Sequence, residues 1–534
     1  MKRKTYRLAS LALTGALALS LAACGGGGTA ATTPATPSAA PAVSATPAET
    51  GGYANQIVIG TLSDPTYIDP NAPGVGPSEI NVTQQIYEGL VRTAEDGSIQ
   101  PLLAKDWGVS EDALTYTFNL KPGIKFSDGS AVTGDDWVWS LYRARDYETS
   151  NYRFIAEAID TVEATDSQVV ITLKYPWAPF LADLANFNMV VGSKAHWGAV
   201  GDEAYLNDPL GTGPYMVKEW NRGQSLTLEA NPYYHEAGYP KTPEIKYTVV
   251  SDDNTRLMQL QSGQIDVVGD LPFSVAPMVE ADPSLNLDVF PSTQIRYLIL
   301  NTTKPPFDDV KVRQALYYAL NKQEMATAVA GQYGESVAAL VSSTQEKWSN
   351  SSLKVTDYAP DTAKQMLSDA GYTQPVQFTL SIRSGSTVYE QIATLIKSQV
   401  DKAGFDCQIE MLEKAAISDK YTSLSHQATI LQWVDDIEDP SGITGWTVDY
   451  DQCDAWYTGL NDAELDQLNT NASMEMDETK RVEMYQEIQQ RIYDNANVIP
   501  LFSNGFAYAA SQKVEGLYVS PFYVYQAMNW TKSE

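Results

Sequence analysis

Hydrophobic and polar positions follow two different periods along the chain from about residue 57 onward. Short runs rich in Val, Ile, Leu, Thr and Tyr predict strands over Ile57–Leu62, Gln168–Tyr175, Ser225–Ala230, Ile245–Ser251, Ile295–Asn301, Gln377–Arg383, Asp406–Leu412 and Ala428–Val434. Apolar residues at helical spacing predict helices over Glu79–Leu90, Asp135–Arg145, Val310–Ala330, Thr362–Ala370, Val388–Ala403 and Glu478–Asn495. This mixture predicts an α/β fold with mixed sheets.

One predicted strand–helix–strand unit indicates where a ligand would bind. Gln377–Arg383, Val388–Ala403 and Asp406–Leu412 follow one another, and Gly404 ends the helix between the strands. A crossover of this kind pairs its two strands in parallel. Ligands of open parallel sheets bind beyond the carboxyl ends of the strands.

Opposite charges fall at this predicted edge of the sheet. Arg383 ends one strand, and Asp435 and Asp436 come directly after the run Ala428–Val434. The pattern therefore predicts a cation and an anion in one crevice. Asp435 competes with Asp436 for the role of anion, and the two side chains point in opposite directions if the strand continues.

The first residues are typical of an export signal. Four basic residues among the first seven precede an apolar run from Leu8 to Ala23, which predicts a signal peptide over residues 1–23. A membrane-spanning helix is the alternative, but spanning needs about 20 apolar residues and this run is shorter. Leu21-Ala-Ala-Cys24 resembles a bacterial lipobox. That resemblance implies that Cys24 receives lipid; a chance cysteine at an ordinary cleavage site is the alternative.

The segment after Cys24 has a composition that is typical of a linker. Residues 25–52 read GGGGTAATTPATPSAAPAVSATPAETGG, with one charged residue and no aromatic residue. Such a segment buries too little apolar surface to fold. Residues 24–52 are therefore predicted to be a lipidated cysteine and a flexible tether, which hold the protein at the outer face of the cell membrane.

Composition excludes several classes of protein. Of 534 residues, 36 are Lys or Arg and 66 are Asp or Glu, which gives a formal charge of −30. This balance argues against nucleic-acid binding, which needs clustered basic residues. Three His and three Cys leave little for a metal site. Beyond Cys24, Cys407 and Cys453 are predicted to form either a disulfide or two inert buried thiols.

Seven short phrases along the chain resemble those of a known family. They are Tyr87-Glu-Gly-Leu-Val91, Leu120-Lys-Pro-Gly-Ile-Lys-Phe-Ser-Asp-Gly129, Leu210-Gly-Thr-Gly-Pro-Tyr215, Gln259-Leu-Gln-Ser-Gly-Gln-Ile-Asp266, Leu300-Asn-Thr302, Asp308-Asp-Val-Lys-Val-Arg-Gln-Ala-Leu316 and Trp433-Val-Asp-Asp-Ile-Glu-Asp-Pro440. Through these phrases the chain resembles the extracytoplasmic solute-binding proteins of the peptide/nickel ABC-transporter family (family 5), in its peptide- or dipeptide-binding lipoprotein branch. The resemblance covers nearly all of the chain after residue 57.

The resemblance implies two lobes of α/β structure that close on a ligand, as periplasmic binding proteins do. The first lobe would take residues 53–86, 206–298 and 503–534, with an inserted subdomain over 87–205. The second lobe would take residues 299–502. Two strand crossings, near Leu298–Asn301 and Leu501–Gly505, would form the hinge.

The resemblance also implies which residues bind ligand. In the peptide-binding branches the Asp three residues after the Trp pairs with the ligand's α-ammonium, and this position is Asp436, counted from Trp433. In the dipeptide-binding branch an Arg just before the helix of the strand–helix–strand unit, here Arg383, pairs with the α-carboxylate, which a guanidinium grips bidentately. The alternatives are a helix cap or loop charge for Asp436, and a surface position or a protein ion pair for Arg383.

Further contacts follow from the same resemblance. The backbone of Gln432, Trp433 and Val434 is expected to pair with a peptide as a strand would. Asp64 and Tyr67 follow the first predicted strand, where the family contacts ligand; an ordinary loop is the alternative. If Arg383 and Asp436 hold the two termini, their separation selects the peptide length, since a dipeptide or tripeptide spans roughly 7–11 Å.

The implied function is that of a non-catalytic receptor, monomeric and without cofactor or metal, that delivers short peptides to ABC permease subunits. Alternatives are another solute, such as a nickel chelate, haem or an oligosaccharide, or a peptide sensor without transport. An exported hydrolase has little support. No Gly-x-Ser-x-Gly occurs, and His196, His235 and His426 lie in unconnected contexts.

Overall fold

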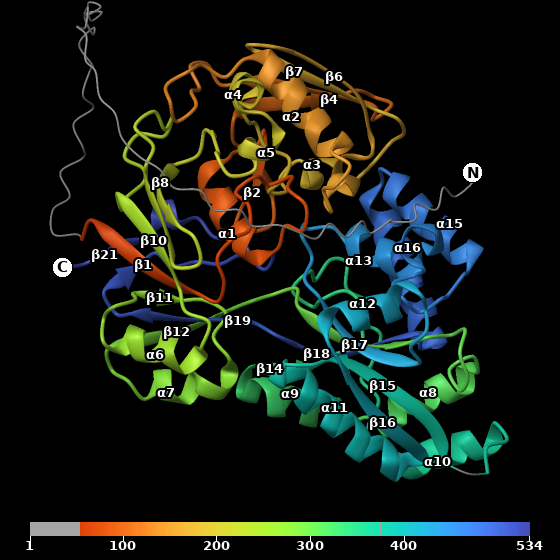
Figure 1. Cartoon of the computed structure of the whole chain (residues 1–534). Helices are drawn as coiled ribbons and strands as arrows, with labels where there is room; N and C mark the ends of the chain where they lie inside the picture. Colours follow the sequence, from red (N-terminus) through yellow and green to blue (C-terminus); the bar gives the residue numbers. More distant parts are fainter. Residues whose placement is uncertain (1–53, 374) are drawn as a thin grey trace, which may run out of the picture. The chain divides into compact units, whose positions relative to one another are not determined.

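Figure 1 shows a computed structural model of the chain, which describes residues 54–373 and 375–534. For residues 452 and 453 only the backbone is described. The predicted signal peptide, the predicted lipidation site Cys24 and the predicted tether lie outside the described residues. Every strand predicted from the sequence is present, with ends that differ by no more than two residues.

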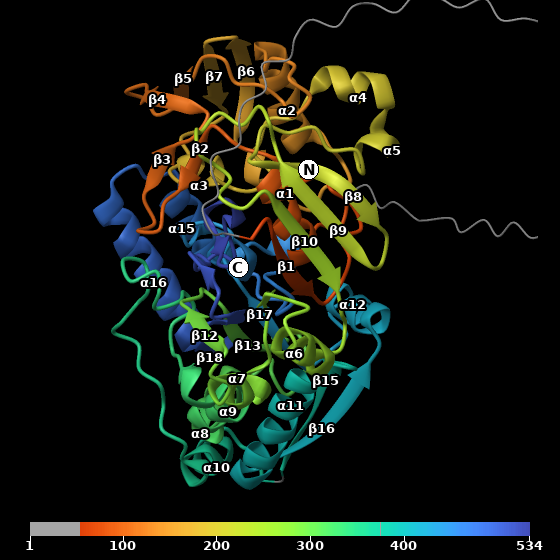
Figure 2. The ribbon, with the colours of Figure 1, turned by 90° about the vertical axis from the view of Figure 1, so that its left-hand side faces the viewer.

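A seven-stranded sheet forms the centre of the first lobe. Its strand order is β12 (Leu285–Phe290), β19 (Phe506–Ser511), β11 (Val267–Val268), β1 (Gln56–Thr61), β10 (Glu244–Val249), β9 (Ser225–Ala230) and β8 (Tyr215–Asn221). β1 pairs in parallel with β10 and β11, and Figure 2 shows β10, β9 and β8 side by side. Ile57 and Ile59 pack in one cluster with residues of α1 (Pro77–Ile86), whereas Val58 packs with residues of α6 (Asp253–Gln261) and α7 (Ala276–Glu280). Helices therefore cover both faces of this sheet.

A four-stranded antiparallel sheet forms the centre of the subdomain. Its order is β4 (Ala104–Val109), β5 (Thr115–Leu120), β7 (Gln168–Leu173) and β6 (Ile159–Thr165). In Figure 1, α2 (Gly134–Asp146) lies across this sheet, and its Trp137 and Leu141 are buried in the core. The remaining elements are β2 (Val91–Thr93), β3 (Ile99–Pro101), η1 (Arg153–Ala156), α3 (Phe180–Asp183), α4 (Lys194–Val200) and α5 (Asp202–Tyr205).

A six-stranded mixed sheet forms the centre of the second lobe. Its order is β14 (Gly334–Ser336), β18 (Val498–Asn504), β13 (Ile295–Leu300), β17 (Ala428–Trp433), β15 (Val376–Arg383) and β16 (Phe405–Leu412). The predicted strand–helix–strand unit is confirmed as β15, α11 (Thr387–Val400) and β16, because β15 pairs in parallel with β16. β15 also pairs in parallel with β17. Arg383, the last residue of β15, and the segment after Trp433 therefore lie at the carboxyl ends of neighbouring parallel strands.

Helices lie on both faces of the six-stranded sheet. Leu298 and Leu300 of β13 are buried in a cluster with α8, α10 and α11, whereas Ile295 and Tyr297 are buried in a cluster with α13, α15 and α16. The helices of this lobe other than α11 are α8 (Val310–Ala319), α9 (Lys322–Ala330), α10 (Pro360–Asp369), α12 (Lys414–Thr422), α13 (Ser441–Val448), α14 (Tyr450–Cys453), α15 (Ala463–Met474) and α16 (Glu478–Asn495). None of the described helices has the length and apolar character that crossing a membrane requires.

The single helix predicted over Val310–Ala330 is wrong. The structure has two helices there, because Leu320 is extended with φ −114° and ψ 121°. Asn321 then caps α9 by accepting a hydrogen bond from the backbone N–H of Glu324. Asn at this position favours a helix start over a helix interior, a signal that the apolar stripe through both helices obscures.

The chain crosses between the two large sheets at two places. β12 ends at Phe290 and β13 begins at Ile295, and β18 and β19 are separated by Gly505 alone. The second crossing lies within the predicted segment Leu501–Gly505. The first lies before the predicted segment Leu298–Asn301, whose first three residues belong to β13, where the strand pairs on both sides.

The two crossings also touch each other. A Cβ atom on Gly505 would lie 2.4 Å from the carbonyl oxygen of Phe290, so no side chain fits at this point of the fold. Phe290 in turn pairs with Phe506, the residue after Gly505.

Cys407 lies on β16 as a buried free cysteine. Burial raises the pKa of its thiol to about 12, so the sulfur stays protonated and unreactive at neutral pH. This agrees with the buried-thiol alternative for Cys407, whereas the side chain of Cys453 lies outside the part of the chain that the structure describes.

Lys322, in the first turn of α9, is a buried cation that makes no ion pair with any described residue. Its Nζ donates to the carbonyl of Val337 at 3.2 Å, and burial lowers the pKa of the amine to about 7. Between that pKa and the unfolded value near 10.4 the unfolded chain binds more protons, so this group makes stability rise with pH.

Lys322→Met is therefore expected to raise the free energy of unfolding by about 1–3 kcal/mol at pH 6.5. The gain at pH 9.5 is expected to be smaller. Urea unfolding at both pH values measures the difference. The control is the exposed Lys311→Met on α8, for which the gain is expected to be near zero at both pH values. An equal gain from Lys322→Met at both pH values would contradict the prediction.

Candidate functional site

A cavity of about 470 Å³ lies where the two lobes and the subdomain meet. The segment that ends β17 and follows it lines the cavity with Gln432, Trp433, Val434 and Asp436. The first lobe contributes Leu62, Pro77, Asp270, Phe506 and Tyr523, among others, and the subdomain contributes Arg92, Thr93, Tyr152, Asn186 and Phe187. Four of the seven ligand-binding residues predicted from the sequence are thus brought together in one cavity.

The two consecutive aspartates after β17 have different environments. Asp435 is buried, accepts a hydrogen bond from Trp433 Nε1 at 2.7 Å, and donates its backbone N–H to Thr293 Oγ1 at 2.9 Å. Asp436 lines the cavity and makes no hydrogen bond or ion pair with any residue that the structure describes. Asp435 is therefore a structural residue, and Asp436 presents its carboxylate to the cavity.

Burial in the cavity wall raises the pKa of Asp436 to about 7. Removal from water disfavours the charged form of a carboxyl group, and no nearby cation among the described residues offsets that cost. A carboxylate in this state gains a large electrostatic interaction when a cation enters. The cavity therefore suits a ligand that carries a positive charge.

The backbone of β17 has an unpaired edge beside Asp436. β17 pairs with β13 along its whole length up to Trp433, but with β15 only through Ala428 and Thr429. Beyond Thr429 the edge that faces β15 has no strand partner among the described residues. An extended ligand could add to the sheet at this edge.

Trp433 is held in place by aromatic contacts. Its ring centroid lies 5.7 Å from that of Trp446 and 5.9 Å from that of Trp456, in addition to the hydrogen bond to Asp435. The next residue, Val434, packs against the apolar cluster of the first lobe. The segment that carries Asp436 is thus anchored on both sides of the cavity.

Asp270 and Arg92 line the cavity but were not predicted from the sequence. Asp270 follows β11 with a positive φ of 51° and accepts a hydrogen bond from the hydroxyl of Tyr523. Arg92 lies on β2, and its guanidinium is 3.9 Å from Glu236. Arg92 directly follows the family phrase that ends at Val91, but nothing in the sequence indicates that this segment reaches the cavity.

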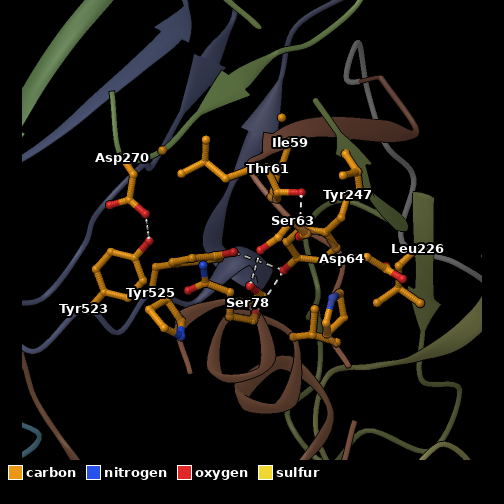
Figure 3. A pocket seen from close by; sticks show the side chains of 18 of the residues that line it. Ile59, Thr61, Ser63, Asp64, Ser78, Leu226, Tyr247, Asp270, Tyr523 and Tyr525 are labelled. Carbon is orange, nitrogen blue, oxygen red and sulfur yellow. Dashed lines mark hydrogen bonds between the residues drawn. The ribbon is translucent and has the colours of Figure 1, made fainter. Parts of the chain in front are cut away.

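Asp64 and Tyr67 lie outside this cavity. Asp64 accepts hydrogen bonds at 2.9 Å from Trp220 Nε1 and from the backbone N–H of Gly223. It lines a neighbouring cavity of about 250 Å³ in the first lobe, shown in Figure 3. Tyr67 packs against a small apolar cluster around Val75. Both have structural partners in this conformation, and their predicted ligand contacts stay a prediction.

Arg383 also lies outside the residues that line the cavity. It is exposed at the end of β15 and makes no ion pair or hydrogen bond with any described residue. Its charge acts on the pKa of two neighbouring tyrosines, Tyr389 on α11 and Tyr421 on α12. Its predicted contact with a ligand stays a prediction.

Comparison with known proteins identifies the family. The family profile "Bacterial extracellular solute-binding proteins, family 5 Middle" matches residues 98–452. The chain belongs to this family of solute-binding proteins. As a member of the family it is a binding protein and not an enzyme.

Curated relatives cover most of this family 5 chain. A probable D,D-dipeptide-binding periplasmic protein of Escherichia coli, DdpA, is 26% identical over 483 residues, which cover 88% of this chain and 92% of the relative. The glutathione-binding protein GsiB of Pectobacterium atrosepticum is 29% identical over 494 residues, which cover 88% and 92%.

Solved structures show the same fold. The periplasmic binding protein DppA of Helicobacter pylori, in complex with the peptide STSA, has a TM-score of 0.78 and 23% identity, covering 91% of this chain and 99% of its own. The oligopeptide-binding protein AppA of Bacillus subtilis, in complex with a nonapeptide, has a TM-score of 0.77 and 24% identity, covering 90% and 100%. The predicted two-lobed periplasmic-binding-protein fold is confirmed.

Proposed function

We propose that this family 5 protein captures short peptides in the cavity between its lobes and delivers them to an ABC permease. The observation that carries the proposal is the carboxylate of Asp436, which lines the cavity without a partner among the described residues. A peptide's α-ammonium is the cation that would pair with it. The names of the relatives support this ligand class, since they include a dipeptide-binding and a glutathione-binding protein.

The peptide main chain would add to the unpaired edge of β17. Bonds from the backbone of Gln432, Trp433 and Val434 would hold it with little dependence on its side chains. The register between β15 and β17 puts Ser381 opposite Thr429. If this parallel register is continued by two residues, Arg383 lies at the level of Leu431. A peptide whose ammonium is at Asp436 and whose main chain follows this edge would point its carboxylate toward Arg383.

Arg383 and Arg92 are both candidates for pairing with the peptide's carboxylate, and we propose Arg383. Arg383→Ala is expected to weaken binding of a free-acid dipeptide or tripeptide by about tenfold or more, because a charged hydrogen-bonded pair is lost. The same peptide with an amidated C-terminus should bind both proteins equally. Calorimetric titration measures both affinities.

Arg92→Ala serves as the matched comparison, because Arg92 lines the cavity and Arg383 does not. If Arg92→Ala, and not Arg383→Ala, shows the difference between acid and amide, the carboxylate lies in the subdomain wall and the proposed role of Arg383 fails.

We also propose that Cys24 anchors the protein by lipid at the outer face of the cell membrane, after removal of residues 1–23. The motif Leu21-Ala-Ala-Cys24 and the linker-like segment after it support this part of the proposal. A lipidated receptor on a tether would meet its permease as a monomer.

Native mass spectrometry of the purified protein, followed by sequencing of the released ligand, tests the function directly. One short peptide per protein is the expected result. Release of an oligosaccharide, haem or a nickel chelate would replace peptide by that solute. If the protein binds a peptide but supports no peptide uptake by cells, it would instead be a sensor.

A further inference from the structure

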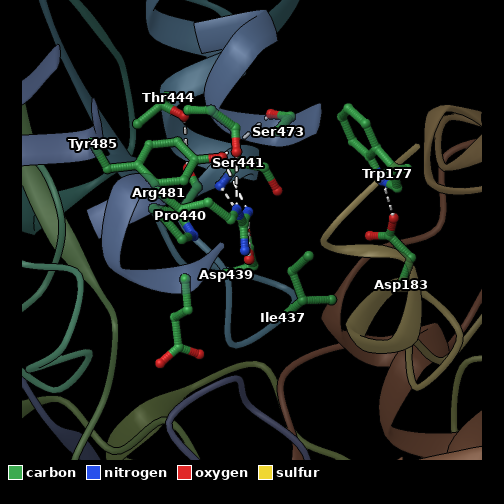
Figure 4. A network of polar contacts seen from close by, with 12 residues as sticks. Trp177, Asp183, Ile437, Asp439, Pro440, Ser441, Thr444, Ser473, Arg481 and Tyr485 are labelled. Carbon is green, nitrogen blue, oxygen red and sulfur yellow. Dashed lines mark hydrogen bonds and ion pairs between the residues drawn. The ribbon is translucent and has the colours of Figure 1, made fainter. Parts of the chain in front are cut away.

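Buried arginines are few in the part of the chain that the structure describes. They are Arg256, Arg296, Arg313 and Arg481. Arg256 Nη2 lies 2.6 Å from Asp253 Oδ1. Arg481 Nη2 lies 2.9 Å from Asp439 Oδ2, a pair that Figure 4 shows. Because a charge is costly to remove from water, a buried guanidinium needs an acidic partner of this kind or a full set of hydrogen bonds.

Arg313 has the full set of hydrogen bonds. It makes no ion pair with any described residue, but its Nε and Nη2 donate to the backbone and side-chain oxygens of Asn495 at 2.8 and 2.6 Å. Its Nη1 donates to the carbonyl of Phe307 at 2.7 Å. All three nitrogens of Arg313 are thus used within the fold, and the residue is structural.

Arg296, on β13, has neither an acidic partner nor a full set of hydrogen bonds. It is 8% exposed, and only its Nη1 donates, to Gln294 Oε1 at 3.0 Å and to Asn504 Oδ1. Its Nε is buried and has no partner among the described residues. Its Nη2 donates to none of them either, but unlike Nε it keeps some exposed surface. The N–H groups on Nη2 are therefore left for an anion.

Arg296 lies at the edge of the six-stranded sheet that borders the cavity between the lobes. β13 is antiparallel to β17, and Arg296 pairs there with Gln432. Both Gln432 and Gln294, which hydrogen-bonds Arg296, line the cavity of about 470 Å³. Arg296 is thus the neighbour of two residues of the cavity wall. Since directly opposed residues of an antiparallel pair share a face, the side chains of Arg296 and Gln432 leave the same side of the sheet.

A second guanidinium without an ion pair among the described residues lies close by. Arg383 is level with Leu431 if the register of β15 and β17 is continued, and so lies one step along the strand from Arg296 and Gln432. The charges of both arginines lower the pKa of Tyr389, which burial otherwise raises. In a chain with 66 acidic and 36 basic residues, two neighbouring arginines without an acidic partner indicate that an anion from outside pairs with them.

The register of the proposed peptide shows which of its side chains would face Arg296. An α-ammonium at Asp436 puts the first residue of the peptide beside Val434. An antiparallel strand then has its second residue beside Trp433 and its third beside Gln432. The third side chain leaves the same face as those of Gln432 and Arg296. Its Cα would lie about 10 Å from that of Arg296, twice the strand spacing, a gap that an Arg and a Glu side chain span together.

We propose that Arg296 is a specificity-determining residue that binds the side-chain carboxylate of a peptide whose third residue is Glu. The proposal rests on the proposed function, because it takes the α-ammonium to lie at Asp436 and the α-carboxylate at Arg383. The free N–H groups of Arg296 would donate to the Glu carboxylate in a charge-assisted hydrogen bond. Gln294 and Asn504 already hold the guanidinium in place, so binding orders no free side chain of the protein.

The first test compares the tripeptides Ala-Ala-Glu, Ala-Ala-Gln and Ala-Ala-Ala by calorimetric titration at pH 7.5. Gln has the shape of Glu without its charge. Ala-Ala-Glu is expected to bind about tenfold or more tighter than Ala-Ala-Gln. Equal affinity for these two peptides would overturn the inference and leave the proposed function intact. If none of the three peptides binds, the proposed function and the inference both fail.

The position of the acid tests the register. The second side chain of the peptide leaves the opposite face of the sheet, so Ala-Glu-Ala should bind no tighter than Ala-Gln-Ala. An equal gain from Glu in the second place would overturn the inference, because the charge would then act without reaching Arg296 along the proposed path.

Variants of Arg296 test the residue itself. Arg296→Gln is expected to bring Ala-Ala-Glu and Ala-Ala-Gln within about twofold of each other, while Ala-Ala-Ala, which has no side-chain acid, still binds and so shows that the variant is folded. Arg296→Lys, which keeps a charge, should restore part of the preference. Arg383→Ala is expected to weaken all three peptides and to keep the preference for Glu. If Arg92→Ala removes the preference and Arg296→Gln does not, the acid binds in the subdomain wall and the inference is overturned.

A free dicarboxylate is the other source of the same chemistry, and glutarate is the probe for it. Glutarate is expected to bind weakly or not at all, because it has no ammonium for Asp436 and no peptide main chain. If it binds tightly, Arg296→Gln abolishes that binding, and the peptides show no preference, the two arginines form a site for free dicarboxylates and the inference about peptides is overturned.

Discussion

Asp436→Asn is expected to weaken the binding of a short peptide by about 100-fold or more. The variant keeps the shape of the side chain and removes the negative charge that would face the α-ammonium, and loss of one partner of a buried charge pair costs about 2–5 kcal/mol. Calorimetric titration with the peptide that co-purifies with the protein measures the loss.

A chemical change to the ligand provides the matched control. The N-acetylated peptide has no α-ammonium and should bind the unmodified protein and Asp436→Asn equally weakly. The ligand-free variant should also unfold at a higher temperature at pH 7.5, because it lacks a carboxylate whose pKa the folded protein raises. Full affinity of Asp436→Asn for the unacetylated peptide would contradict the proposed role of Asp436.

Peptide affinity is expected to fall by about 50-fold between pH 7 and pH 5. The pKa of Asp436 in the ligand-free protein is about 7, so the carboxyl group becomes protonated across this range and must release a proton to pair with an ammonium. The peptide termini keep their charges over the same range. Affinity measured at half-unit intervals of pH tests the slope.

Two other acids near the cavity also have raised pKa values, so a variant must isolate the effect of Asp436. Burial raises the pKa of Glu438 to about 7 and that of Asp435 well above its usual value. In Asp436→Asn the affinity, though weaker, should vary little with pH. If the affinity of Asp436→Asn keeps the full pH dependence, the group that titrates would instead be Glu438 or Asp435. Net proton uptake on binding at pH 6 would contradict the sign of the prediction.

Local patterns in the sequence predicted much of the second lobe. The strand–helix–strand unit could be recognised because its periods, its length and Gly404 all indicate the same elements. Parallel pairing then put the ends of β15 and β17 at one edge of the sheet. The choice of Asp436 over Asp435 came from the family resemblance and not from side-chain alternation, because β17 ends at Trp433, before both residues.

Contacts between distant segments could not be read in this way. Asp64 follows β1 as expected, but Trp220 and Gly223, more than 150 residues away, occupy its carboxylate. Arg92 reaches the cavity only because the subdomain packs over the cleft.

The close approach of Gly505 to the carbonyl of Phe290 restricts how the lobes can move. Two strands in such contact can bend together, but neither can slide past the other without a collision. If the lobes open at this predicted hinge, both strands would therefore rotate together, whatever ligand is bound. A membrane partner that senses only this angle could distinguish full receptors from empty ones without reading the peptide itself.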